Sequence, residues 1–241
     1  MGLPKLDTVE YFLQLPISKV EVKYRPFNVK EQKVLLQAIE EANSRAISNA
    51  LISLIKACAE IQDDNYKVEQ LSNTDLEWIF IHLRKKSVGE STQIRVLCTD
   101  ESCDGMSTVD VDFDKIKVVG EVKDDIVQLT ENVGVKLRIP GFYDVQQILG
   151  DMENKFDSNN MFQVLNKCIV QIFDQDNVYD TKEFTQKEID EFIDELTVDQ
   201  FNKVMNWFGD VPKLVYETEF SCEKCGTKQQ QVLEGLQNFF V

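Results

Sequence analysis

The chain has 241 residues, of which 43% are hydrophobic, and it carries a formal net charge of −16. This length allows one large domain or two small ones, and a core of that size does not need its six cysteines as disulfide staples. So acidic a balance argues against broad binding to nucleic acid, which depends on basic surface that neutralises phosphates.

The acidic residues gather in the last third of the chain. Between Asp151 and Asp199 there are 13 acidic and 4 basic residues. Such a stretch is most often a set of solvated helix faces, although it also suits partners with basic surfaces. The N-terminus lacks a basic stretch followed by an apolar run, and no apolar stretch approaches the length of about 18 residues typical of a membrane helix. We therefore expect synthesis in a reducing cytoplasm and no membrane segment.

The first 90 residues are predicted to form a strand and three helices. Residues 1–16 carry few charges, which favours a short arm or helix that lies on the body or on a partner; their apolar side chains include Leu3, Leu6, Val9, Phe12, Leu13 and Leu15. Alternation over 19–24 predicts a strand. Asn28 followed by Glu31 is the pattern of a capping box, so a helix is expected from there to about Glu41. Two further helices are expected over 44–59 and 74–88.

A region rich in strands and then a helical region follow. Strand-like runs occupy 91–98, 106–113, 115–122, 126–129 and 133–139, and Pro140-Gly141 ends the pattern. Residues 161–173 resemble one amphipathic helical segment, and capping pairs at Thr185 and Thr197 predict helices over 186–196 and 197–209. Two more strand-like runs, 213–221 and 228–233, close the chain.

Two pairs of cysteines sit where the strand-like runs would turn. Cys98 and Cys103 have four residues between them, Cys222 and Cys225 have two, and 118 residues separate the pairs. Two hairpin tips that each offer two thiolates make the ligand set of a tetrahedral Zn²⁺ site. Four cysteine ligands complete the coordination of the ion and leave no position for an activated water, so such a zinc would be structural. Four reduced thiols without metal, or a disulfide or redox pair, are the alternatives.

The other chemistry-bearing residues predict no catalytic site. Cys58 and Cys168 lie in apolar helix-like runs and are expected to be buried thiols. His82 is the only histidine and lies in a helix-like stretch, and no Ser/His/Asp or Cys/His relay can be recognised around it. No glycine-rich phosphate loop is present. The sequence therefore favours a protein that is not an enzyme and has no small-molecule substrate.

These expectations together define an α+β fold. Its core is a zinc-ribbon-like β unit formed by two distant cysteine-bearing hairpins, with N-terminal helices before it and a helical insertion inside it. The expected divisions are 1–90 for the N-terminal strand and helices, 91–140 for the β-rich region with the first cysteine pair, 141–212 for the helical insertion, and 213–241 for the hairpin that completes the core.

Three stretches resemble a known family. Residues 20–36, with Arg25-Pro26-Phe27 at their centre, look like the opening of the baseplate hub family of T-even-like contractile-tailed bacteriophages. Residues 83–90 resemble a second block of that family, and 222–226 with 233–240 resemble its C-terminal end. The resemblance covers about 3–105 and, less closely, 210–241; the middle does not match.

The resemblance implies a non-enzymatic, late phage protein. Members of the family include a hub subunit and a hub-assembly protein, which act through contacts with other hub proteins when the centre of the tail baseplate forms. The implied location is the virion tail baseplate, or the host cytoplasm during assembly. The alternatives are a zinc-ribbon adaptor of phage transcription or replication and an enzyme with an unrecognised site.

Both ends of the chain are candidates for partner contacts. Apolar side chains concentrate there beyond what a solvated arm needs, and we expect them to be buried against a partner or against the protein's own core. The candidates are Leu3, Leu6, Phe12, Leu236, Phe239 and Phe240.

Overall fold

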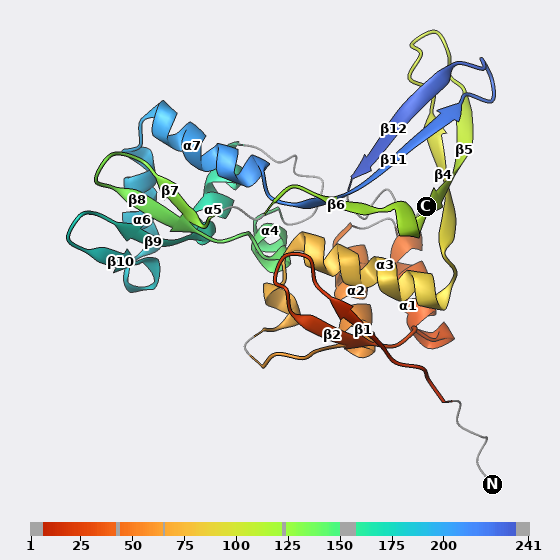
Figure 1. Cartoon of the computed structure of the whole chain (residues 1–241), viewed down its shortest axis with the longest axis horizontal. Coiled ribbons are helices and arrows are strands. Elements are labelled where there is room, and N and C mark those ends of the chain that lie inside the picture. Colours follow the sequence, from red (N-terminus) through yellow and green to blue (C-terminus); the bar gives the residue numbers. More distant parts are fainter. Residues whose placement is uncertain (1–6, 42–43, 65, 122–123, 150–157, 235–241) are drawn as a thin grey trace.

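The computed structural model describes residues 7–41, 44–64, 66–121, 124–149 and 158–234. Within them the chain is a mixed α/β protein with seven α-helices and several small antiparallel sheets. Figure 1 shows three parts: an N-terminal body, a pair of long hairpins that rises from it, and a lobe at the opposite end of the long axis. The expected mixture of helices and antiparallel strands is confirmed.

The N-terminal body packs three helices against a three-stranded sheet. The sheet order is β1-β2-β3, all antiparallel. Val22, Leu51, Ile55 and Phe80 are almost fully buried in the core that these elements share. The elements are β1 (Tyr11–Gln14), β2 (Glu21–Tyr24), α1 (Val29–Glu40), α2 (Ser44–Cys58), β3 (Ala59–Ile61) and α3 (Asn73–Ser87).

Capping side chains mark where helices α1 and α3 begin. The Asn28 side chain accepts the N–H groups of Lys30 and Glu31, and the Glu31 carboxylate accepts the Asn28 N–H at 2.7 Å, so the predicted capping box is present. Ser72 caps α3 in a similar way, through the N–H of Asp75. These contacts satisfy N–H groups that have no partner inside the helix.

The N-terminal stretch, expected to be a short arm or helix on the body or on a partner, lies on the body in its described part but forms a strand. Residues 11–14 are a strand in register with β2, and Leu15 is only 1% exposed. The carboxylate of Asp75 in α3 accepts the N–H groups of Ile17 and Ser18, which holds the turn between the two strands on the body. Residues 1–6 lie outside the described part of the chain.

Two hairpins form the second part of the molecule. The first consists of β4 (Ser91–Leu97) and β5 (Met106–Asp112); the second consists of β11 (Lys213–Ser221) and β12 (Lys228–Glu234), with β6 (Lys117–Val119) added beside β11.

The hairpins pack face to face, since side chains from both share one core. Its buried residues include Ile94, Val96, Val111, Tyr216 and Leu233. The Tyr216 hydroxyl also donates to the Asp110 carbonyl of the first hairpin at 3.1 Å. Residues far apart in the sequence are thereby fixed against one another.

The lobe is a four-stranded antiparallel sheet covered by helices, in the order β10-β9-β8-β7. Leu165, Ile169, Ile193 and Val204 are buried in its core. Its elements are β7 (Ile126–Gln128), β8 (Gly134–Leu137), α4 (Phe142–Leu149), α5 (Ser158–Cys168), β9 (Ile169–Phe173), β10 (Val178–Asp180), α6 (Gln186–Asp194) and α7 (Val198–Gly209).

The lobe differs from the expected helical insertion. The predicted helical segment 161–173 is wrong in its second half, because the helix ends at Cys168 and Ile169–Phe173 is a strand paired with β8. Apolar and β-branched residues dominate this strand, and its pairing in the sheet overrides the helical periodicity that precedes it. The segment 141–212 therefore supplies two strands as well as helices, and β7 and β8 from 91–140 complete its sheet.

Candidate metal centre

Each of the four cysteines that were predicted to bind zinc lies at the tip of a hairpin. Cys98 and Cys103 flank the turn between β4 and β5, and Cys222 and Cys225 lie in the turn between β11 and β12. The two tips point to the same end of the paired hairpins (Figure 1). The face-to-face packing of the hairpins thus brings together two pairs that the sequence separates by 118 residues.

The four sulfur atoms form a compact cluster. All lie within 4.8 Å of one another, with Cys98 Sγ 3.7 Å from Cys225 Sγ and Cys103 Sγ 3.9 Å from Cys222 Sγ. A bond of about 2.3 Å from zinc to each sulfur places neighbouring sulfurs of a regular tetrahedron roughly 3.8 Å apart. These separations are far longer than a disulfide bond of about 2.05 Å. The four thiols could therefore hold one metal ion.

The second tip has the backbone of a tight ligand loop. Gly226 has φ of +75°, a conformation that side-chain-bearing residues rarely adopt. Its N–H donates to the Cys222 carbonyl at 2.8 Å, and the Cys222 N–H donates to the Thr227 carbonyl at 2.9 Å. These contacts curl the chain so that both thiols of the tip face the first hairpin.

The first tip is longer but is also closed by backbone hydrogen bonds. The Cys98 N–H donates to the Gly105 carbonyl at 2.8 Å, and the Cys103 N–H donates to the Asp100 carbonyl at 2.9 Å. Gly105 lies in close contact with the opposite tip. A Cβ at this position would lie 2.8 Å from Lys224 Cβ and 2.9 Å from Cys222 Sγ. Glycine is therefore required for the two tips to approach.

Polar side chains connect the tips around the sulfur cluster. Gln229 Nε2 donates to Cys98 Sγ at 2.7 Å, while Gln229 Oε1 accepts the Thr99 N–H at 3.1 Å. On the other side, the Glu223 N–H donates to Ser107 Oγ, and the Glu223 carboxylate accepts the Thr108 N–H at 2.9 Å. Each contact joins one hairpin to the other, so polar contacts support the approach of the two tips on both sides of the cluster.

The environment shifts the pKa values of Cys103, Cys222 and Cys225 in different directions. Backbone N–H groups of Cys225 and Lys224 lower the pKa of Cys222 to about 6, and hydrogen bonds from Thr227 lower the pKa of Cys225. The Gly105 N–H lowers the pKa of Cys103, but desolvation and the neighbouring thiols outweigh it and raise that pKa to about 12. A thiolate is the form that ligates metal, and part of the cluster is already biased towards it.

The other sequence-predicted residues lie away from this cluster. Cys58 and Cys168 are buried as expected, in the N-terminal body and the lobe, and burial raises the pKa of each to about 12. His82 is packed against Trp78, with ring centroids 4.5 Å apart. Phe12 is 61% exposed in β1. The remaining partner candidates, Leu3, Leu6, Leu236, Phe239 and Phe240, lie outside the described residues.

Sequence reasoning missed Gly105 and Gln229. Gly105 follows Cys103 by two residues, and its proximity to a ligand position was a usable signal. No signal in the sequence identified Gln229, because it is one of three consecutive glutamines and differs from the next two only in being buried in the folded protein.

No helix in the described part of the chain is long and apolar enough to cross a membrane.

Fold and site together define a mixed α/β protein in which two hairpins, distant in the sequence, pack together and bring four cysteines into one cluster. The chain belongs to the family of T4 bacteriophage base plate proteins, whose model matches residues 8–241. It is similar to a curated protein of Enterobacteria phage T4, "Baseplate hub assembly protein gp26", with 20% identity over 231 residues that cover 96% of this chain and 98% of the relative. No solved structure matches.

These findings confirm the resemblance to the phage baseplate family that was based on residues 20–36, 83–90, and 222–226 with 233–240. The family and the relative are described as baseplate and baseplate assembly proteins, and neither description is that of an enzyme. The expectation of a non-enzymatic protein agrees with them. The match also extends through the middle of the chain, where sequence inspection found no resemblance.

Proposed function

We propose that the chain takes part in building the central hub of a phage tail baseplate, through contacts with other hub proteins. The observation that carries this proposal is the family match over nearly the whole chain, supported by the description of the T4 relative as a hub assembly protein. The protein would act in the host cytoplasm during assembly and would reach the baseplate of the virion if it stays bound.

We further propose that the cysteine cluster holds a structural Zn²⁺ and that the paired hairpins act as a zinc-ribbon-like unit. An all-thiolate tetrahedral set is typical of zinc among the common divalent ions, and four protein ligands leave no site for a reactive water. The ion would supply a cross-link between residues 98–103 and 222–225. Its role would be to hold the two hairpins together, which is a role for an assembly scaffold and not for a catalyst.

The alternative of a zinc-ribbon adaptor in transcription or replication has less support. It would need a basic face beside the cysteine tips. The tips carry acidic side chains instead, and Lys224 is paired with Asp104. The acidic residues at the tips are Asp100, Glu101, Asp104 and Glu223.

Contacts with hub proteins are tested by co-expressing the chain with each of the other hub proteins of its phage, followed by size-exclusion chromatography. The full-length chain should elute together with at least one of them. Phe12→Ser should weaken that complex without lowering the melting temperature, since Phe12 is 61% exposed. Deletion of 1–6 tests Leu3 and Leu6 while leaving β1 in place. A chain that elutes alone with every hub protein contradicts the proposed function.

A further inference from the structure

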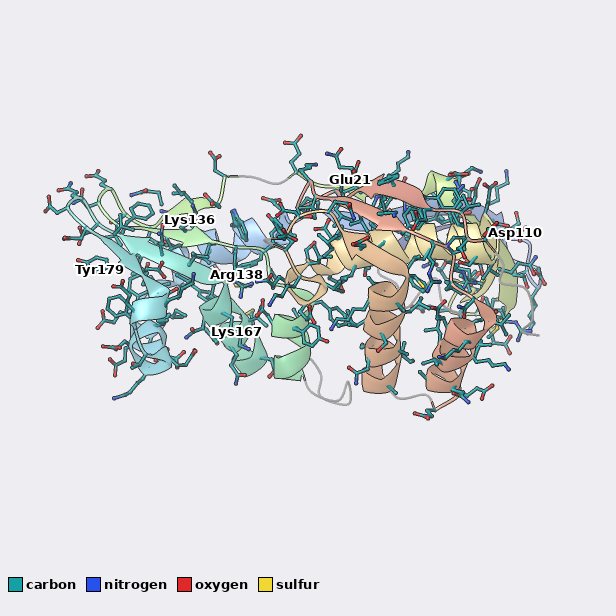
Figure 2. The ribbon with its side chains drawn as sticks, turned by 90° about the horizontal axis from the view of Figure 1, so that it is seen from below. Glu21, Asp110, Lys136, Arg138, Lys167 and Tyr179 are labelled. Atoms are coloured by element: carbon teal, nitrogen blue, oxygen red, sulfur yellow. The ribbon has the colours of Figure 1, made fainter. Side chains whose placement is uncertain are left out.

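The lobe carries an apolar cavity of about 380 Å³ that lies far from the cysteine cluster. Figure 2 shows Tyr179 of the lobe and Asp110 of the hairpins at opposite ends of the molecule. We call this cavity the lobe pocket. It is lined by Val133, Ile172, Phe173, Asp174, Tyr179, Phe184, Glu188, Ile189 and Phe192.

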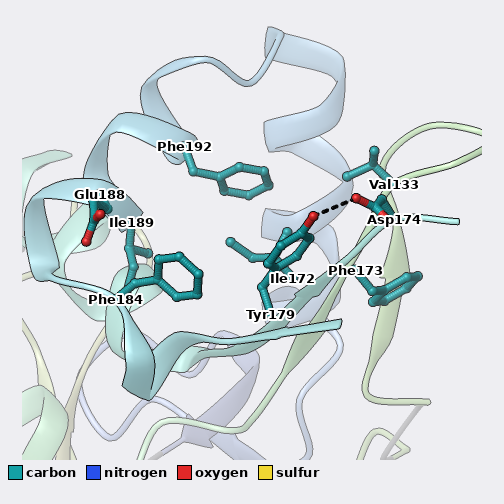
Figure 3. A pocket seen from close by; sticks show the side chains of 9 residues that line it. All are labelled: Val133, Ile172, Phe173, Asp174, Tyr179, Phe184, Glu188, Ile189 and Phe192. Atoms are coloured by element: carbon teal, nitrogen blue, oxygen red, sulfur yellow. Dashed lines mark hydrogen bonds between the residues drawn. The ribbon is translucent and has the colours of Figure 1, made fainter. Parts of the chain in front are cut away.

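Aromatic side chains keep the lobe pocket open. Phe184 and Tyr179 meet edge to face, with ring centroids 6.2 Å apart, and the Tyr179 hydroxyl donates to Asp174 at 2.9 Å (Figure 3). Ile189 forms part of the buried core beneath, while Phe184 stays 40% exposed. A wall fixed by a ring contact and a hydrogen bond does not collapse into the cavity. An apolar surface is thus presented to solvent in a defined shape.

The size and lining indicate what could fill it. The cavity is near the lower end of the roughly 300–1,000 Å³ range of binding pockets. The polar side chains of its lining are two carboxylates and the Tyr179 hydroxyl, which donates to one of them. Small-molecule sites orient their ligands with a few well-placed polar groups, whereas the three polar side chains here are already hydrogen-bonded within the protein. One large apolar side chain of another protein fits better than a cofactor.

The surroundings of the pocket are strongly acidic. Residues 174–199 contain ten Asp or Glu and two Lys, and Lys187–Glu191 is the ion pair seen within this fully described stretch. Backbone N–H donors lower the pKa of Asp174 and Glu188 at the rim, so both carboxylates stay ionised near neutral pH. This concentration of negative charge attracts cations and repels phosphates.

We propose that the lobe pocket receives a segment of a partner protein in which one large apolar side chain is flanked by Lys or Arg. The apolar side chain fills the cavity, and the basic residues lie against the carboxylates of the rim. Few residues usually dominate such an interface, with one buried anchor at its centre and charges that govern the rate of association. This inference rests on the proposed function in taking the partner to be another hub protein.

Two matched pairs of variants test the apolar wall of the pocket and the negative charge of its rim separately. Phe184→Ser removes a pocket wall, and Phe162→Ser, at 39% exposure in α5, is its control outside the pocket. Asp174→Asn with Glu188→Gln removes two rim charges while keeping hydrogen-bond acceptors for the turn and the helix cap. The exposed pair Glu21→Gln with Glu217→Gln removes the same charge elsewhere.

The probes are the purified hub protein that forms a complex with the chain and two hexapeptides, Lys-Lys-Phe-Leu-Lys-Lys and Glu-Glu-Phe-Leu-Glu-Glu. Titration calorimetry should show that Phe184→Ser weakens binding of the hub protein at least about tenfold, whereas Phe162→Ser leaves it unchanged. The rim double variant should reduce both the affinity and its dependence on salt more than the distant double variant does. The lysine peptide should bind the wild-type chain, and the glutamate peptide should not.

The outcomes separate this inference from the proposed function. A complex with a hub protein that every variant forms equally well overturns the pocket and leaves the hub role intact. If no hub protein binds, the hub role fails, and the peptides decide the pocket: selective binding of the lysine peptide supports it, and equal or absent binding overturns it. Self-association that Phe184→Ser abolishes would also overturn it, because the occupant would then be a second copy of the chain.

Discussion

The side chain of Gln229 joins the two cysteine-bearing tips: its Nε2 donates to Cys98 Sγ at 2.7 Å and its Oε1 accepts the Thr99 N–H at 3.1 Å. Gln229 belongs to the second hairpin and both partners belong to the first. A hydrogen bond to a ligand sulfur orients it and stabilises its thiolate, as outer contacts of metal ligands generally do.

Replacing Gln229 with Leu should therefore lower the affinity for zinc about 10–100-fold, the usual effect of removing an outer contact of a metal ligand. The measurement is competition with a chromophoric chelator. Gln230→Leu is the matched control, since its amide contacts Glu219 on the neighbouring strand and no cysteine. Equal affinities for the two variants would show that the Gln229 contact does not support the ligand.

Metal analysis of protein purified under reducing conditions should find one zinc per chain. Structural zinc contributes on the order of 10 kcal/mol of apparent folding free energy in small metal-dependent domains. Removal by a strong chelator, or the substitution Cys222→Ser, should therefore unfold the hairpin pair or aggregate the protein. Cys168→Ser, which changes a buried thiol outside the cluster, should leave the zinc content unchanged. Soluble, reduced and fully folded protein without metal would contradict the zinc proposal.

Gly105→Ala should destabilise the protein and weaken metal binding. The new Cβ would overlap Lys224 Cβ and Cys222 Sγ, and such overpacking typically costs about 1–3 kcal/mol. Gly209→Ala is the control, because nothing lies within 4 Å of its Cβ position. That change should be neutral or stabilise by about 0.4–1 kcal/mol through the unfolded chain. Urea unfolding of the two variants distinguishes a steric contact from a general effect of losing glycine.

His82 should make stability depend on pH. Burial lowers its pKa below the ordinary value of 6.5, and the nearby charges are Lys85, Lys86 and Asp114. The unfolded chain therefore binds the proton of His82 more readily than the folded chain does. The stability that comes from keeping His82 neutral is complete above pH 6.5, and it is lost as the pH falls through the lower pKa of His82 in the folded chain.

The His82 effect is measured by urea unfolding of the wild type and of His82→Phe at pH 7.5 and pH 5.5. The wild type should lose more stability between these values than the variant does, and the difference removes contributions that both proteins share. Identical losses would mean that the histidine is equally protonated in the folded and unfolded chains.

The local elements could largely be predicted from the sequence, because each depends on neighbours in the chain. Asn28 with Glu31 placed the start of α1, and Thr185 and Thr197 placed α6 and α7. Strand-like alternation gave β11 its bounds. The four candidate ligands also followed from spacing alone, since each pair needed only its own turn.

Tertiary packing decided the rest. Whether Cys98 and Cys225 meet depends on the core shared by two hairpins, and no spacing within either pair reveals that contact. Ile169–Phe173 became a strand because β8 offered it a partner, which is a property of the sheet and not of the segment. The same holds for the lobe pocket: alternation and helical periodicity predict which residues are apolar, but Phe184 and Tyr179 border a cavity only because β9, β10 and α6 pack with a gap between them.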